Sequence, residues 1–239
     1  MISHDPFELD GAPLPVLLEL FASDDAHERA DAACAVGDRL RCREIVTLDP
    51  ATLEQLVQLL QDPAAPVRFE AAIAIALTHD ARATAPLIAA LDSRALRLDA
   101  IRALGTTCDP DAIAPLTRLM QKWFMPWADR LQAAAALCAL GDVSGATYLE
   151  NRLASRRHAE RAAAVHFVGE SHHPRARKIL EGILADITHP LRDVAARSLG
   201  LLGDQGARAA LEGARAQADV DLRADIDQAL ATLGRPAQA

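Results

Sequence analysis

Seven segments of this chain repeat one short pattern around an arginine, and this repetition constrains the fold more than any other feature. Each segment carries small or apolar residues three, six and seven positions after its arginine, and six of the seven also carry one four positions after it. Offsets of three, four and seven lie on one stripe of an α-helix, so each segment is predicted to be a helix that buries this stripe. These anchor arginines are Arg29, Arg68, Arg97, Arg130, Arg161, Arg192 and Arg223.

A second apolar stretch precedes each anchor segment, which predicts one helix pair per repeat. Successive anchors are 29 to 39 residues apart, and the last three intervals are each 31 residues. Glycines such as Gly105 and Gly169 stand where second helices should end, and prolines such as Pro66 and Pro126 stand where they should begin. We expect a single domain over residues 1–239, with repeats at about 12–40, 50–80, 83–109, 111–142, 144–171, 174–204 and 206–234.

Composition supports a helical fold. The chain has 239 residues, of which 51% are hydrophobic but 3% are aromatic, so its apolar content is mostly alanine and leucine. This composition suits close packing of helices and argues against a β-sandwich or a β-barrel. The length is ample for a sizeable core, so stability requires neither disulfides nor a structural metal.

The repeated pattern resembles the HEAT family, and more narrowly the short HEAT-like repeat named after phycobilisome lyases. The resemblance rests on a helix pair of about 31 residues and on aspartates six positions before two anchors, Asp62 and Asp186. Aspartates also follow four anchors by twelve positions, at Asp80, Asp109, Asp142 and Asp204, and His173 takes that place in the fifth repeat. The resemblance implies an all-α fold, a right-handed α-solenoid of about seven helix pairs, in which Asp and Arg form a ladder between stacked repeats.

Charge and cysteine usage predict the setting in which the protein works. The formal net charge is −8, and residues 1–120 hold the acidity, with 19 acidic against 10 basic residues. Four cysteines without a CxxC pair are interpreted as reduced thiols. With no signal-peptide pattern and no apolar stretch of about 18 residues, we expect a cytoplasmic protein that does not bind membranes. Its alanine, arginine and leucine content suits a bacterium of high genomic GC content.

A non-catalytic scaffold or adaptor that binds another protein is the predicted function. Two positions after their anchors, Asp31, Glu70 and Asp99 are expected to form an acidic ridge along the concave groove of the solenoid. Five positions after theirs, Arg102 and Arg197 are expected to supply contacts of opposite sign. A groove graded in charge favours one orientation of a long partner. Nucleic acid is not expected as a partner, because a chain with a pI near 5.5 neutralises phosphates poorly.

An aromatic cluster is the strongest local anomaly in the sequence. Trp123, Phe124 and Trp127 fall within the five-residue segment WFMPW, between the two helices of the fourth pair. One interpretation is a hydrophobic wedge that fills a gap between repeats, since large aromatic side chains usually bury. The other is a binding hot spot, since Trp is enriched among such anchors. The sequence leaves both open, and Trp123 and Trp127 are candidate partner-binding residues.

Enzymatic chemistry is not expected, and no cofactor or metal is predicted. In the HEAT-like deoxyhypusine hydroxylases, His-Glu pairs follow the recurring arginine, but here those positions hold residues such as Phe69 and Leu98. The densest possible ligand set, His166, Glu170, His172 and His173, matches no strong zinc spacing and is interpreted as polar residues at a helix end. The resemblance leaves one alternative function, a chromophore lyase or isomerase of the phycobilin-lyase type.

Overall fold

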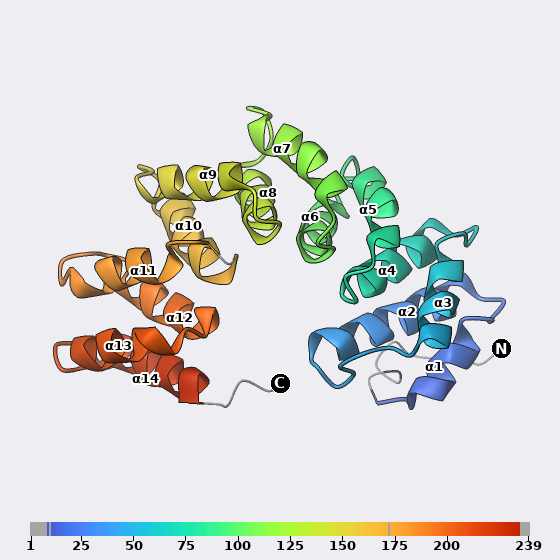
Figure 1. The fold of residues 1–239 in the computed structure, drawn as a ribbon, viewed down its shortest axis with the longest axis horizontal. Helices are drawn as coiled ribbons and strands as arrows, with labels where there is room; N and C mark the ends of the chain where they lie inside the picture. Colours follow the sequence, from blue (N-terminus) through green and yellow to red (C-terminus); the bar gives the residue numbers. More distant parts are fainter. Residues whose placement is uncertain (1–8, 10, 172, 235–239) are drawn as a thin grey trace. The chain divides into compact units, whose positions relative to one another are not determined.

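The computed structural model describes residue 9 and residues 11–171 and 173–234. Over these residues the chain forms fourteen α-helices and three short 3-10 helices, with no strand (Figure 1). The predicted all-α solenoid of helix pairs is therefore confirmed, while its right-handedness stays a prediction. In this same part of the chain, no helix has the length and apolar character needed to cross a membrane.

The helices of the described residues form seven successive pairs. The first helices of the pairs are α1 (Leu14–Leu20), α3 (Pro50–Leu59), α5 (Thr84–Ala90), α7 (Ile113–Gln121), α9 (Val143–Leu153), α11 (Ala176–Ala185) and α13 (Arg208–Arg215). The second helices are α2 (Ala26–Arg41), α4 (Ala65–Ala76), α6 (Arg97–Thr106), α8 (Trp127–Ala139), α10 (His158–Glu170), α12 (Arg192–Leu202) and α14 (Val220–Gly234). Short 3-10 turns at Ala81–Ala83, Pro110–Ala112 and Gln205–Ala207 lead into α5, α7 and α13.

The helices gather into two compact units, residues 1–115 and 116–239, and the boundary falls inside α7. In unit 1, α2 packs on α4 and α4 packs on α6, while α1, α3 and α5 contact these second helices from one side. In unit 2, α8, α10, α12 and α14 form the corresponding row, covered by α9, α11 and α13 (Figure 1). Each unit is therefore a two-layer stack of first helices on second helices, while the prediction of a single domain stays a prediction.

The core of each unit is built from alanine and leucine. On α4, Ala71, Ala72 and Ala74 have no exposed surface, and on α8 Ala133 and Ala134 are equally buried. Small side chains let the helix backbones approach closely, while the first helices contribute larger ones. The fully buried leucines of the first helices include Leu17, Leu56, Leu87, Leu116, Leu149, Leu180 and Leu211.

Several repeats carry glycine eight positions after the anchor arginine, and some of these glycines contact the next second helix. A Cβ added to Gly37 on α2 would lie 3.5 Å from the Cα and Cβ of Ala74 on α4, which is ordinary contact. A Cβ added to Gly169 on α10 would lie 2.7 Å from both the Cβ and the carbonyl oxygen of Ser198 on α12. The glycine is therefore required by the close approach of α10 and α12, but not by that of α2 and α4.

Each anchor arginine donates to a backbone carbonyl at or just after the end of the first helix of its own pair. Arg130 Nε donates to the Met120 carbonyl at 2.8 Å, and Arg192 Nε donates to the Leu184 carbonyl at 2.9 Å. The last carbonyls of a helix lack intrahelical partners, so this guanidinium satisfies them and joins the two helices of the pair. The other anchor acceptors are the carbonyls of Ser23, Asp62, Leu91, Ser155 and Ala218.

The aspartates twelve positions after the anchors make other hydrogen bonds than the Asp–Arg ladder that the resemblance implied. Asp80, Asp109, Asp142 and Asp204 each accept a hydrogen bond from the backbone N–H two residues later, at 2.8 to 3.0 Å, so they cap the start of the next pair. His173 does the same through Nδ1, which accepts from the Arg175 N–H at 3.1 Å. Arg29 fits such a ladder, since it pairs with Asp62 of the next repeat at 2.7 and 3.0 Å.

Candidate functional site

The predicted acidic ridge lies on the second helices of unit 1, and its three members have different surroundings. Asp31 on α2 and Glu70 on α4 are half-buried, whereas Asp99 on α6 is exposed. Glu70 interacts electrostatically with Asp99. Glu70 and Asp99 therefore influence each other, and a ridge that also includes Asp31 stays a prediction.

Burial controls the chemistry around Glu70. Its carboxyl group loses solvent against α2, which raises its pKa, and Asp99 and Asp38 raise it further while Arg41 acts in the opposite direction. The neighbouring Cys34 thiol forms a hydrogen bond with Glu70. Burial together with this carboxylate raises the pKa of Cys34 to about 12. A thiol with so high a pKa is protonated at neutral pH, so Cys34 is a weak nucleophile.

The two arginines predicted to contact a partner are engaged inside the molecule. Arg102 forms a short ion pair with Asp99, three residues earlier on α6. Arg197 on α12 binds Asp193 Oδ2 and Asp225 Oδ2, each at 3.0 Å. Both side chains are still about half exposed, but their charges are offset by these carboxylates. Arg102 belongs to unit 1 and Arg197 to unit 2, so a single graded groove stays a prediction.

The aromatic segment has the opposite character, because its rings face solvent. In the loop between α7 and α8, the Trp123 residue is 85% exposed and Phe124 is 66% exposed. Their rings contact each other edge to face, with centroids 5.8 Å apart and planes at 87°. Trp127, the first residue of α8, is half-buried. The wedge interpretation is therefore wrong for Trp123 and Phe124.

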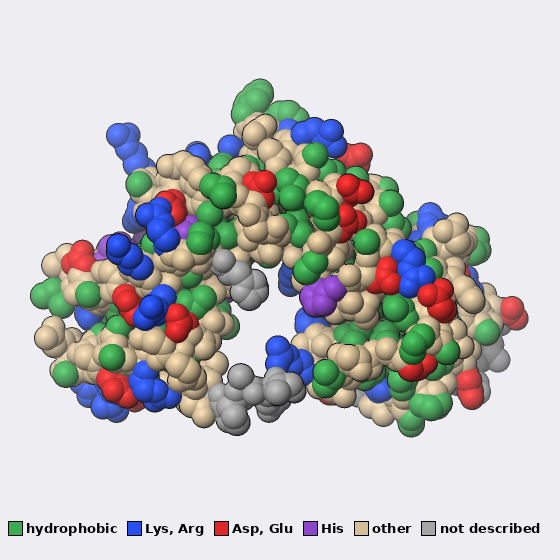
Figure 2. Space-filling model, viewed as in Figure 1, with side chains coloured by type: hydrophobic (Ala, Val, Ile, Leu, Met, Phe, Trp, Pro, Cys, Tyr) green, Lys and Arg blue, Asp and Glu red, His purple; other side chains and the backbone are tan. Residues whose placement is uncertain are grey.

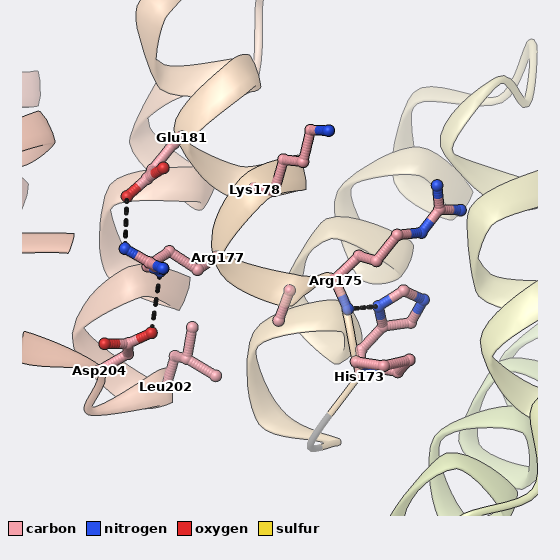
Figure 3. Close-up of a pocket in the computed structure, with 9 residues that line it drawn as sticks. His173, Arg175, Arg177, Lys178, Glu181, Leu202 and Asp204 are labelled. Carbon is pink, nitrogen blue, oxygen red and sulfur yellow. Dashed lines mark hydrogen bonds and ion pairs between the residues drawn. The ribbon is translucent and has the colours of Figure 1, made fainter. Parts of the chain in front are cut away.

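Unit 2 also contains an open pocket of about 500 Å³ at the start of α11 (Figure 3). Two of its cations already have partners: Arg175 donates to Glu150 Oε1 at 3.1 Å, and Arg177 Nε lies 3.0 Å from Asp204 Oδ2. Figure 3 shows the Arg177 guanidinium between Glu181 and Asp204. Most of the positive charge in this pocket is thereby neutralised by the protein itself.

The possible metal ligands are divided between two places. His166 Nε2 lies 3.2 Å from Glu170 Oε2 on the exposed face of α10. His173 is buried, and its Nε2 lies 3.1 Å from Glu150 Oε1 on α9. His172 lies outside the described residues. Over the described part of the chain, no group of three or more potential metal-ligating side chains occurs.

Comparison with protein families supports the repeat pattern read from the sequence. Residues 53–123 match the family model described as HEAT repeats. Within this range the chain is similar to HEAT repeats. No curated protein matched the sequence significantly.

Several solved structures of other proteins are similar to this chain. The complex of CpcE and CpcF of phycocyanin lyase from Nostoc sp. PCC7120 matches with a TM-score of 0.57 and 20% identity, covering 93% of this chain and 95% of that one. Human deoxyhypusine hydroxylase matches with a TM-score of 0.42 and 20% identity, covering 97% and 89%. A designed armadillo repeat protein matches with a TM-score of 0.44 and 18% identity, covering 93% and 100%. At 20% identity, the similarity to the CpcE and CpcF complex shows a shared fold and nothing more.

Proposed function

We propose that this protein is a non-catalytic scaffold or adaptor that binds another protein, with the α7–α8 loop as its anchor. The observation that carries the proposal is the 85% exposure of Trp123 beside an exposed Phe124. An indole and a phenyl ring in water cost free energy that is recovered when a partner covers them. Trp is also enriched among the few residues that supply most of the binding energy at interfaces.

The charged residues of unit 1 have a secondary role in this proposal. Asp99 is offset by Arg102, and the half-buried Glu70 has a raised pKa, so the acidic ridge carries less free charge than three exposed carboxylates would. We keep Asp31, Glu70 and Asp99 as residues that steer a partner, because long-range attraction acts even when no contact forms. Arg102 and Arg197 are kept as contacts that exchange their internal carboxylates for those of a partner.

The remaining parts of the proposal concern the setting. We place the protein in the cytoplasm, without a cofactor, with neither nucleic acid nor membrane as its partner. The acidic composition and the absence of a membrane-spanning helix over the described residues support this setting. Bacterial origin remains part of the proposal on compositional grounds.

The test is the affinity for a partner captured from native lysate and then purified. The double variant Trp123→Ala, Phe124→Ala should weaken binding by at least tenfold, mainly through faster dissociation. The matched control is Val143→Ala, Val220→Ala, which removes two other exposed apolar side chains of unit 2, at 76% and 81% exposure. Equal affinity for the wild type and the Trp123, Phe124 variant would rule out the α7–α8 loop as the anchor.

A chromophore lyase or isomerase is the alternative, and its motivation is the fold shared with the CpcE and CpcF complex. Co-expression with a bilin and its acceptor protein separates the two functions. We expect the purified chain to remain colourless and the acceptor to gain no extra pigment. Visible absorbance on this chain, or faster attachment of pigment to the acceptor, would replace the scaffold proposal with the enzymatic one.

A further inference from the structure

The cations of unit 2 fall into two classes according to whether the protein neutralises them. On the helices or at their first turn, four arginines each lie within 3.1 Å of a carboxylate oxygen: Arg175, Arg177, Arg197 and Arg215. In the intra-pair loops, Lys122, Arg156 and Arg157 are exposed, and none of the described carboxylates forms an ion pair with them. These loops therefore present free positive charge, whereas the four arginines just named are offset by carboxylates. Arg118 on α7 and Lys178 on α11 are also exposed without a described ion pair.

These loops are joined by a row of side chains that crosses two repeats. Arg130 binds the Met120 carbonyl at the end of α7, and its guanidinium lies over the Tyr148 ring of α9, 5.4 Å from the centroid. Arg152 lies over the same ring at 4.7 Å, and its Nη1 is 3.5 Å from Glu160 Oε1 on α10. The row ties the end of α7, which carries the aromatic loop, to the end of α9, which carries Arg156 and Arg157.

The aromatic and basic groups therefore share one edge of unit 2. Figure 2 shows hydrophobic side chains gathered over the α7–α8 loop and lysine or arginine side chains over the α9–α10 loop. We call this edge the loop edge and define it by Lys122, Trp123, Phe124, Arg156 and Arg157. Glu160 is buried and bonded to Ser155, so it offsets Arg152 and leaves the two loop arginines free.

We propose that the loop edge binds an acidic segment of the partner protein, in which an apolar side chain flanked by Asp or Glu docks against Trp123 and Phe124. This inference rests on the proposed function and adds the chemistry of the partner. Unpaired arginines beside exposed aromatic rings are complementary to a segment that supplies both an apolar group and carboxylates. Arginine binds carboxylates through two parallel N–H groups, so Arg156 and Arg157 select acidic side chains over neutral ones.

A selection from a phage-displayed library of random peptides on the full-length protein tests the proposal. Peptides that bind the wild type should be enriched in Asp and Glu next to Trp, Phe or Leu. Their affinity should fall at least tenfold as salt rises from about 50 to 500 mM, because the attraction between exposed charges is screened. Selection on Arg156→Glu, Arg157→Glu should lose the acidic preference and favour Lys and Arg. The matched control, Lys178→Glu, Arg208→Glu, makes the same charge change on α11 and α13 and should keep it.

The outcomes separate this inference from the proposed function. Peptides that require Trp123 and Phe124 but show no acidic preference would overturn the inference and leave the anchor in place. Peptides that bind the Trp123→Ala, Phe124→Ala variant as well as the wild type would overturn both. The protein could also sediment with phosphatidylglycerol vesicles but not with phosphatidylcholine vesicles. If the Trp123→Ala, Phe124→Ala variant lost this sedimentation, the loop edge would be assigned to anionic lipid instead. Concentration-dependent dimerisation lost in the Arg156, Arg157 variant would make a second copy of this chain the occupant.

Discussion

Gly37 in unit 1 and Gly169 in unit 2 occupy the same place in the repeat, eight positions after an anchor arginine, yet their surroundings differ. The seam between α2 and α4 leaves room for a methyl group at Gly37, whereas the seam between α10 and α12 leaves none at Gly169. A shared repeat template therefore fixes where two helices meet but not how closely they approach. The same holds for the surface, since unit 1 carries partly offset carboxylates and the loops of unit 2 carry free cations.

The largest expected difference between the units concerns these two glycines. Gly169→Ala should destabilise the protein by about 1–3 kcal/mol, because its Cβ would collide with the Ser198 backbone and force α10 and α12 apart. Gly37→Ala should be neutral or stabilise by up to about 1 kcal/mol, because alanine has the higher helix propensity. Urea unfolding of the two variants measures both. Similar losses at the two positions would mean that the seams are equally tight.

A smaller difference is expected between the stability losses caused by substituting Asp62 in unit 1 and Asp142 in unit 2. Both aspartates cap a backbone N–H, but only Asp62 of the two also pairs with Arg29. Asparagine keeps the capping oxygen, so Asp62→Asn removes mainly the ion pair and should cost about 1–2 kcal/mol at pH 7. Asp142→Asn should cost less than about 0.5 kcal/mol.

The pH dependence sharpens this second comparison. Hydrogen bonds from Arg29 lower the pKa of Asp62 in the folded state. Its contribution to stability is therefore present above the ordinary aspartate pKa of about 3.9 and is lost as the pH falls through the lowered value. The difference between wild type and Asp62→Asn should shrink below about pH 4 in urea titrations. A difference that stays constant down to pH 2 would assign the loss to packing.

The smallest expected effect concerns two carboxylates with opposite surroundings. Burial raises the pKa of Glu70, so its ionised form is unfavourable in the folded state, whereas Glu160 lies 3.5 Å from Arg152. Glu70→Gln should stabilise the protein by up to about 1 kcal/mol at pH 7, and this gain should vanish below the ordinary glutamate pKa of about 4.3. Glu160→Gln should destabilise it. Thermal midpoints at pH 4 and pH 7 measure both, and a loss in Glu70→Gln at pH 7 would contradict the raised pKa.

The architecture was predictable because it depends on a local pattern. The anchor arginines and the apolar stripe mark the second helices, and in the described residues each of the seven second helices contains its anchor arginine. The pairing of Asp99 with Arg102 and of Asp193 with Arg197 also follows helical spacing, three and four residues apart, so the sequence contained the signal that these arginines are engaged. That Arg102 and Arg197 contact a partner stays a prediction.

The candidate site was only partly predictable. The sequence shows that Trp123 and Trp127 are the first and last residues of the segment WFMPW. Whether their rings are exposed depends on the conformation of the loop, which no periodicity determines. The Arg130, Tyr148 and Arg152 row joins side chains of different helices, and the chain's single tyrosine gave no sign of it. The contact between Arg29 and Asp62 spans 33 residues, so it becomes visible only when the stacking of the repeats is known.

The bond from each anchor arginine to the first helix of its own pair has a consequence for how such a chain can change in length. An arginine that closes its own helix pair needs no matching residue in a neighbouring copy. A gene segment that encodes one such pair can therefore be duplicated or deleted without breaking this hydrogen bond. The bond from Arg29 to Asp62 crosses from the first pair to the second, so the first two pairs would have to be inherited together to keep it.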